Sequence, residues 1–95
     1  MDIIVTENAV RSFQDEWGIE NGQYVRIYAK YAGGGEDAYA IGINASVEPV
    51  DPAIVKSIGG YLFFIEHNDA WILKDKTIKI DSNEEGIFFG DMLSL

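Results

Sequence analysis

The chain turns at Tyr31-Ala32-Gly33-Gly34-Gly35-Glu36-Asp37, a triple-glycine loop that lies between two strand-like segments. Gln23–Tyr31 precedes the loop and Tyr39–Asn44 follows it. In both segments one face is apolar at every second residue, which is the period of a β-strand. Two such segments joined by a glycine-rich connection favour an antiparallel hairpin. The rest of the fold is expected to form around this hairpin.

Upstream of the hairpin, the sequence predicts a short strand and one amphipathic helix. Ile3-Ile4-Val5 has the β-branched composition of a strand. Thr6 is a suitable N-cap, because its hydroxyl can accept a hydrogen bond from an N–H of the first helical turn. Apolar residues then recur at helical spacing, which predicts a helix over Thr6–Trp17. Gly18 is suited to end this helix in a left-handed conformation.

Downstream of the hairpin, the chain reads as short strands with one further helical turn. The expected elements are a strand at Ile54-Val55 paired with Tyr61–Glu66 across a Gly59-Gly60 turn, a short helix at Asn68–Leu73, and strands at Thr77–Asp81 and Ile87–Phe89. The fold class predicted is one domain over residues 1–95, mainly β with an N-terminal α-helix. Its strands form a two-sheet pseudobarrel or sandwich with one short second helix. The alternation of strands and helices that a doubly wound parallel sheet needs is absent.

The apolar residues also predict a core. Leu62-Phe63-Phe64-Ile65 is apolar on both faces, so this strand is expected to be central and covered on both sides. The aromatic residues expected in the core are Phe13, Trp17, Phe63, Phe64, Trp71, Phe88 and Phe89. An amphipathic outer face is expected for the alternating residues Tyr24, Arg26, Tyr28 and Lys30.

Composition excludes several classes of function. Seven Lys and Arg residues against sixteen Asp and Glu residues leave a formal charge of −9, which disfavours binding to nucleic acid or to anionic membranes. The chain has no cysteine, so it can form no disulfide and no thiolate metal site. The N-terminus has no positively charged region followed by an apolar run, and no stretch is long enough to span a membrane. The expected location is the cytoplasm.

Motifs for common ligands are incomplete. The glycine loop continues into Glu36-Asp37 and a strand, whereas a phosphate-binding loop needs Gly-Lys-Ser/Thr and a helix. The acidic turn Asp81–Gly86 matches the first half of a calcium-binding EF-hand loop, but Met92 stands where a bidentate glutamate is required. His67 is the only histidine and has no second histidine or cysteine with which to hold zinc.

The order of these elements resembles the HesB/IscA-like family, the A-type iron–sulfur scaffold and carrier proteins. The resemblance begins at Ile4-Val5-Thr6-Glu7-Asn8-Ala9 and continues through Tyr24–Gly35, the first long strand with its glycine loop. Gly60–Ile65 is similar to the segment that leads into the family's short helix, and Thr77–Asp81 to the strand after it. The resemblance implies a compact pseudobarrel of two sheets.

The family's chemistry is not implied in the same way, because its ligands are missing. The family binds iron or a cluster through one cysteine just after the glycines and a Cys-Gly-Cys near the C-terminus. In this chain Gly35 or Glu36 stands at the first position, and Ser82–Leu95 holds no cysteine. Carboxylates do not replace thiolates around an iron–sulfur cluster at comparable affinity. We therefore expect no cofactor, and in particular no conventional iron–sulfur cluster.

The sequence favours a non-enzymatic protein that binds a protein partner or a ligand. The contact loop would be Gly33, Gly34, Gly35, Glu36 and Asp37, and the partner could belong to iron–sulfur assembly. The resemblance also allows a homo-oligomer.

Two alternatives remain at the level of sequence. The first is a carboxylate-based metal site for calcium, magnesium, manganese or ferric iron, with candidate ligands Glu36, Asp37, His67, Glu84, Glu85 and Asp91. The second is an enzyme, which would need an acid–base pair in one pocket, such as Glu36 with His67. No spacing in the sequence identifies such a pair, so no enzymatic activity is predicted.

Overall fold

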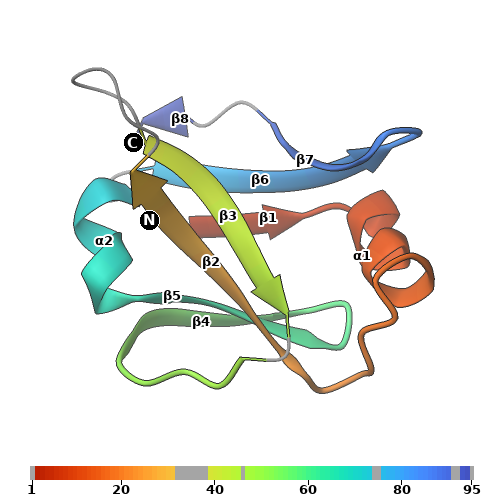
Figure 1. The fold of residues 1–95 in the computed structure, drawn as a ribbon, viewed down its shortest axis with the longest axis horizontal. Coiled ribbons are helices and arrows are strands. Elements are labelled where there is room, and N and C mark those ends of the chain that lie inside the picture. Colours follow the sequence, from red (N-terminus) through yellow and green to blue (C-terminus); the bar gives the residue numbers. More distant parts are fainter. Residues whose placement is uncertain (1, 32–38, 46, 74–75, 91–92, 95) are drawn as a thin grey trace.

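A computed structural model describes residues 2–31, 39–45, 47–73, 76–90 and 93–94. The chain folds into two β-sheets with a helix at each end of the molecule (Figure 1). The elements in chain order are β1 (Asp2–Val5), α1 (Glu7–Asp15), β2 (Tyr24–Tyr31), β3 (Tyr39–Ala45), β4 (Pro52–Ile58), β5 (Tyr61–Glu66), α2 (His67–Leu73), β6 (Lys76–Asn83), β7 (Gly86–Phe89) and β8 (Leu93–Ser94). The predicted class, mainly β with an N-terminal helix and one short second helix, is confirmed.

The first sheet has the strand order β1-β6-β7, with β8 also paired to β6, and the second has the order β3-β2-β5-β4. The predicted hairpin of β2 and β3 is antiparallel, and so is the predicted hairpin of β4 and β5. Two further pairings are parallel: β1 with β6 and β2 with β5. The strands of these parallel pairs are distant in the sequence, so no local turn signal predicts them.

Helix α1 forms where its N-cap was expected. Thr6 has an extended backbone, and its hydroxyl accepts a hydrogen bond of 3.2 Å from the Ala9 N–H. The helix ends at Asp15, two residues before the predicted end, and Gly18 follows with a φ of +65°. This left-handed glycine turns the chain so that Ile19 returns to the core, where it is 6% exposed.

The core lies between the two sheets and under α1. Its fully buried side chains come from every layer of the fold, namely Ile3, Ala9, Phe13, Val25, Ile27, Tyr61, Phe63, Ile65, Ile78 and Ile80. Burial of such side chains stabilises each by roughly 1.5–3 kcal/mol relative to leaving it in water. Phe64 is also fully buried but on the opposite face of β5, which confirms that this strand is covered on both sides.

Three of the expected core aromatics are exposed instead. Trp17 is 41% exposed, Phe88 39% and Trp71 66%. Trp17 lies beyond the end of α1, although its ring still meets Phe13 edge-on at 5.0 Å. Phe88 and Phe89 are neighbours in a strand whose inner face is covered, so only one of them can point into the core. Conversely, Tyr61 was not among the expected core residues and is fully buried, with its hydroxyl donating to the Ile19 carbonyl at 2.7 Å.

Two smaller expectations were also wrong. Strand β6 continues to Asn83, so the turn predicted over Asp81–Gly86 is confined to Glu84 and Glu85. The expected outer face of β2 is covered in part by α2, because Asp69 of α2 pairs with Arg26.

Neither helix in the described residues is long and apolar enough to cross a lipid bilayer.

Candidate functional site

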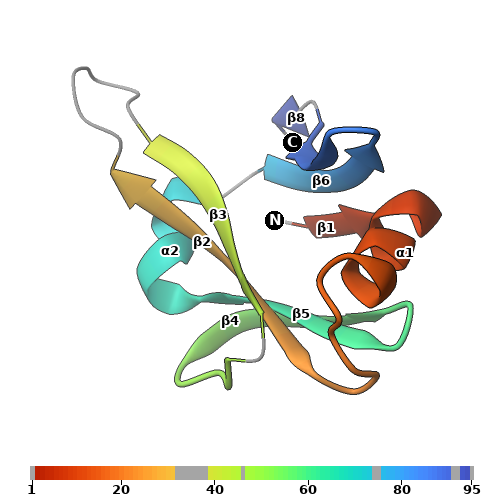
Figure 2. The same cartoon turned by 45° about the vertical axis from the view of Figure 1, so that its right-hand side comes forward.

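The glycine loop connects β2 and β3, which have the longest unbroken pairing in the described part of the chain. Strands β2 and β3 pair without a break from Val25↔Ala45 to Tyr31↔Tyr39. The ends of β2 and β3 that the loop joins project away from the first sheet (Figure 2). The loop residues Gly33, Gly34, Gly35, Glu36 and Asp37 lie outside the described residues, as does Asp91. The structure therefore describes the two strands that lead into and out of the loop.

Helix α2 supports the base of the hairpin through one buried carboxylate. Asp69 is 6% exposed, and its Oδ2 lies 3.0 Å from the Arg26 Nη2. Its Oδ1 accepts a hydrogen bond of 3.3 Å from the Ala29 N–H of the same strand. A charged pair that is also bonded to the backbone fixes a helix more firmly than a surface ion pair does. The carboxylate of Asp69 thus joins α2 to the middle of β2, at Arg26 and Ala29.

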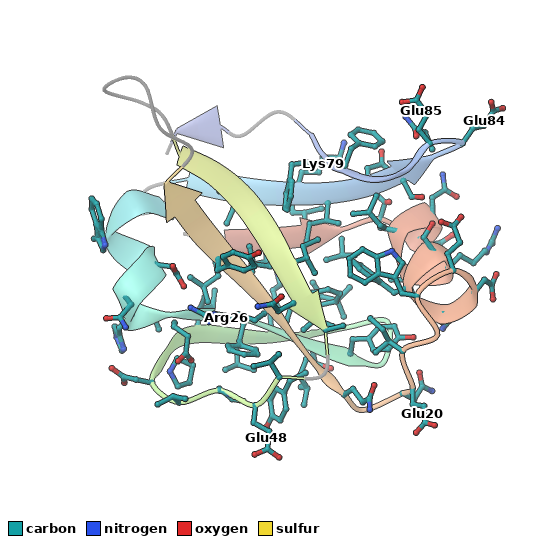
Figure 3. All side chains as sticks on the ribbon, viewed as in Figure 1. Glu20, Arg26, Glu48, Lys79, Glu84 and Glu85 are labelled. Atoms are coloured by element: carbon teal, nitrogen blue, oxygen red, sulfur yellow. The ribbon has the colours of Figure 1, made fainter. Side chains whose placement is uncertain are left out.

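The guanidinium of Arg26 has two further features. Its central carbon lies 5.6 Å from the centre of the Tyr28 ring, within the range of a cation–π contact. Its Nε is buried without a hydrogen-bond partner among the described atoms. Figure 3 shows Arg26 on the second sheet, remote from the acidic turn at Glu84 and Glu85. The Arg26 side chain therefore supports the β2–β3 hairpin through its contacts with Asp69 and Tyr28.

Gly42 lets the Tyr28 side chain lie across β3. The two residues are opposite each other in the hairpin, and a Cβ at Gly42 would lie 2.3 Å from the Tyr28 ring. A side chain at position 42 would therefore displace this ring. Glycine at this position and the aromatic ring on it keep the hairpin compact below the loop.

The structure does not bring together those proposed metal ligands that it describes. His67 begins α2, where its Nδ1 lies 3.1 Å from an oxygen of Asp51, and both side chains are exposed. Glu84 and Glu85 form the turn between β6 and β7, at the other end of the molecule from α2 (Figures 1 and 3). Among the described residues no three His, Asp or Glu side chains form a group that could hold a metal ion. The pairing of His67 with Glu36 lies outside what the structure describes.

A polar groove that the sequence did not predict lies between α1 and the β6–β7 turn. Its volume is about 390 Å³, and its lining residues are Asn8, Arg11, Ser12, Asp15, Glu16, Ser82, Asn83 and Glu84. The hydroxyls of Ser12 and Ser82 form a hydrogen bond in it. The two serines are seventy positions apart, so only the folded chain reveals the contact.

Beside this groove, Asp81 accepts two hydrogen bonds that favour its charged form. The Thr6 hydroxyl donates to Oδ1 at 2.7 Å, and the Ser82 N–H donates to the same oxygen at 2.8 Å. The hydrogen bond from Thr6, followed by that from Ser82, lowers the pKa of Asp81 below its usual value. Asp81 therefore ties the start of α1 to β6, and its place within that strand differs from the helix-flanked loop of an EF-hand.

The donor set of this chain does not fit an iron–sulfur cluster. Such clusters are held by cysteine thiolates, in some centres with histidines in addition. The sequence has no cysteine and one histidine, and that histidine is near Asp51 at the start of α2.

Comparison with solved structures identifies the fold. A crystal structure of IscA with the 2Fe–2S cluster has a TM-score of 0.64 and 15% sequence identity, with 97% of this chain and 81% of that chain covered. A crystal structure of Escherichia coli SufA, involved in the biosynthesis of iron–sulfur clusters, has a TM-score of 0.64 and 13% identity, with 98% and 80% covered. The chain therefore has the IscA/SufA fold, and the resemblance to HesB/IscA-like proteins is confirmed at the level of structure.

A comparison of sequences finds a different kind of relative. The pyruvate dehydrogenase inhibitor of Bacillus subtilis (strain 168) is 24% identical over 87 residues, which is 90% of this chain and 90% of the relative. No protein-family model matches the chain. The chain is thus similar over nearly its whole length to an enzyme inhibitor, and it shares its fold with proteins of iron–sulfur cluster assembly.

Proposed function

We propose that this chain is a non-enzymatic regulator that acts in the cytoplasm by binding a protein partner. The partner that we propose is a component of the pyruvate dehydrogenase complex. The observation that carries the proposal is an IscA/SufA fold in a chain without a single cysteine. A scaffold that has lost every thiolate can still bind proteins through its surface, whereas it has lost the ligands for a cluster. The similarity to a pyruvate dehydrogenase inhibitor, which covers 90% of each chain, supports this choice of partner.

The glycine loop on the β2–β3 hairpin is the proposed contact surface. Its base is held by Asp69, Arg26 and the Tyr28–Gly42 contact, so binding would cost little ordering of the strands that carry it. Glycines permit close approach of a partner's backbone, and the following Glu36-Asp37 would favour a basic surface on the partner. A partner in iron–sulfur assembly would fit the fold equally well, and the test below separates the two.

The direct test is an inhibition assay. Purified chain is titrated into the pyruvate dehydrogenase complex of the organism that encodes it, and turnover is measured together with complex formation by co-sedimentation. We expect inhibition that saturates as the complex is filled. Full activity at a large excess of chain, with no co-sedimentation, would reject this partner. Capture of an iron–sulfur assembly protein in its place would support the other assignment.

Loop variants then locate the surface. Replacing Gly34 and Gly35 by valine should weaken inhibition by roughly tenfold or more, because two β-branched side chains restrict the loop and block close approach. Ser57→Ala is a matched control on the exposed face of β4 and should inhibit like the unaltered chain. Equal inhibition by the loop variant and the control would remove the loop from the contact. A chelator distinguishes the carboxylate metal site, since co-sedimentation that depends on protein contacts alone should persist in excess EDTA.

A further inference from the structure

Strand β1 has one edge that no other strand occupies in the described part of the chain. It pairs with β6 on one side only, in parallel register from Asp2↔Thr77 to Val5↔Ile80. The Thr6 N–H donates to the Ile80 carbonyl at 3.0 Å, so the backbone groups of residues 4 and 6 face β6. By alternation, the N–H and C=O groups of Ile3 and Val5 face the other side. An unpaired strand edge of this kind is a template for another chain.

Side chains occupy both edge-facing groups of Ile3. The Asp2 Oδ1 accepts from the Ile3 N–H at 2.8 Å, and the Lys56 Nζ donates to the Ile3 carbonyl at 2.9 Å. Lys56 also donates to the same Asp2 oxygen at 2.7 Å, so the three groups form one closed arrangement. The ammonium of Lys56, followed by the Ile3 N–H, lowers the pKa of Asp2. This arrangement is called the Lys56–Asp2 latch below.

Lys56 is a charged residue between two core-facing residues of β4. Ile54 and Ile58 lie two residues to either side of it, and both pack against the core. The period of a strand therefore places Lys56 on the same inner face, at an edge of the second sheet. A charged residue that points inward from an edge strand is one of the ways in which proteins oppose edge-to-edge association.

The edge that the latch covers is complementary to itself. If β1 of a second copy paired with it antiparallel about Ile4, Ile3 of each copy would lie opposite Val5 of the other. Each of the two resulting hydrogen-bonded pairs needs the N–H and C=O of one Ile3, and the latch occupies those groups. The Ile4 side chain is 44% exposed and would meet its counterpart between the two pairs. A second copy is therefore the occupant that this edge fits.

We propose that the Lys56–Asp2 latch keeps the free edge of β1 closed against strand pairing with a second copy of this chain. The latch acts on the backbone groups of Ile3 and leaves the core unchanged. Its ion pair is half-exposed, with Lys56 40% and Asp2 49% accessible, so it can open without disrupting the fold. The formal charge of −9 opposes self-association in addition, and this repulsion is screened by salt.

The test removes the latch and keeps the change in charge matched. Lys56→Met retains the apolar stem and loses the ammonium, whereas Lys79→Met loses one charge on an exposed position of β6. Self-association is measured by sedimentation over a wide range of concentration at moderate salt. We expect Lys56→Met to associate roughly tenfold more tightly than Lys79→Met and the unaltered chain. Equal association of the two variants would overturn the proposal.

A second variant identifies the surface that associates. Val5→Pro removes an edge-facing N–H, and proline is tolerated at a free strand edge. Added to Lys56→Met, it should return association to the level of the unaltered chain, whereas association that persists would show a different surface. If circular dichroism shows that Lys56→Met does not fold, Lys56→Gln with and without Val5→Pro gives the same comparison. Hydrogen exchange adds an independent readout, since the Val5 amide should be protected at high concentration only when the latch is absent.

Discussion

At the scale of single residues, Thr6 joins three parts of the fold. Its hydroxyl accepts from the Ala9 N–H and donates to Asp81, and its own N–H donates to Ile80. The start of α1 is therefore attached to β6 through one small side chain. Substitution of an N-cap threonine by alanine costs about 1 kcal/mol for the cap alone, and here the bond to Asp81 would be lost as well.

The lowered pKa of Asp81 leads to a prediction about pH. A carboxylate whose folded-state pKa is below its unfolded value of about 3.9 stabilises the fold above that value, and the stabilisation is lost as pH falls through the folded-state pKa. Asp81→Asn should therefore be less stable than the unaltered chain at pH 6, and the difference should disappear in strong acid. Urea unfolding at a series of pH values measures it.

Two variants of Thr6 serve as controls for this prediction. Thr6→Ser keeps the donor and should preserve the pH dependence that Asp81 causes, whereas Thr6→Ala should reduce it. A stability difference between Asp81→Asn and the unaltered chain that stays constant into strong acid would contradict the assignment.

At the scale of elements, α2 determines how much of the second sheet is covered. Phe64 lies on the face that α2 covers and is fully buried, and Tyr24 meets its ring edge-on at 5.8 Å. The pair of Arg26 with Asp69 joins α2 to this face. Because Asp69 is almost completely buried, its loss would leave a partly buried guanidinium without its countercharge.

We predict that Asp69→Asn destabilises the chain by about 1–3 kcal/mol in urea unfolding. The matched control is Asp51→Asn, which removes a carboxylate beside His67 where both side chains are exposed. The control should change stability little, since exposed ion pairs contribute little. Hydrogen exchange should show that the amides of α2 open more readily in Asp69→Asn. Equal stability of the two variants would show that the buried pair does not hold the helix.

At the scale of the whole molecule, the fold of a cluster-assembly protein occurs without the residues that hold a cluster. The hairpins, the two sheets and both helices are present, and the sequence contains no cysteine. A fold is maintained by its core, whereas a metal site depends on a few side chains at its surface, so the two can be lost separately.

We predict that anaerobic incubation with iron and sulfide yields no stable stoichiometric cluster in this chain. Carboxylates and a single imidazole are poor ligands for iron–sulfur centres. Visible absorbance after desalting measures the result, with IscA, whose crystal structure contains a 2Fe–2S cluster, as the positive control. A stable cluster at one equivalent per chain or per dimer would contradict both this prediction and the functional proposal.

Local patterns in the sequence were sufficient for the elements and for their sequential pairings. Alternation identified the β2–β3 hairpin, glycines marked the β4–β5 turn, and Thr6 marked the start of α1. Each of these signals spans only a few residues, so it can be read from the sequence without knowledge of the tertiary contacts. The same reasoning could not find the Ser12–Ser82 contact or the Lys56–Asp2 latch, because their partners are 70 and 54 positions apart.

The sequence by itself was sufficient to predict a mainly β chain with the fold of HesB/IscA-like proteins, and it excludes thiolate chemistry because it contains no cysteine. Composition determines which metal-ligand atoms the side chains can supply, and short-range periodicity indicates where strands and helices form. Only the tertiary structure decided that β1 and β6 pair in parallel, that Trp17, Trp71 and Phe88 face solvent, and that Lys56 closes a strand edge. These features depend on which elements come together across the whole chain, since the burial of a side chain is a property of its neighbours in space.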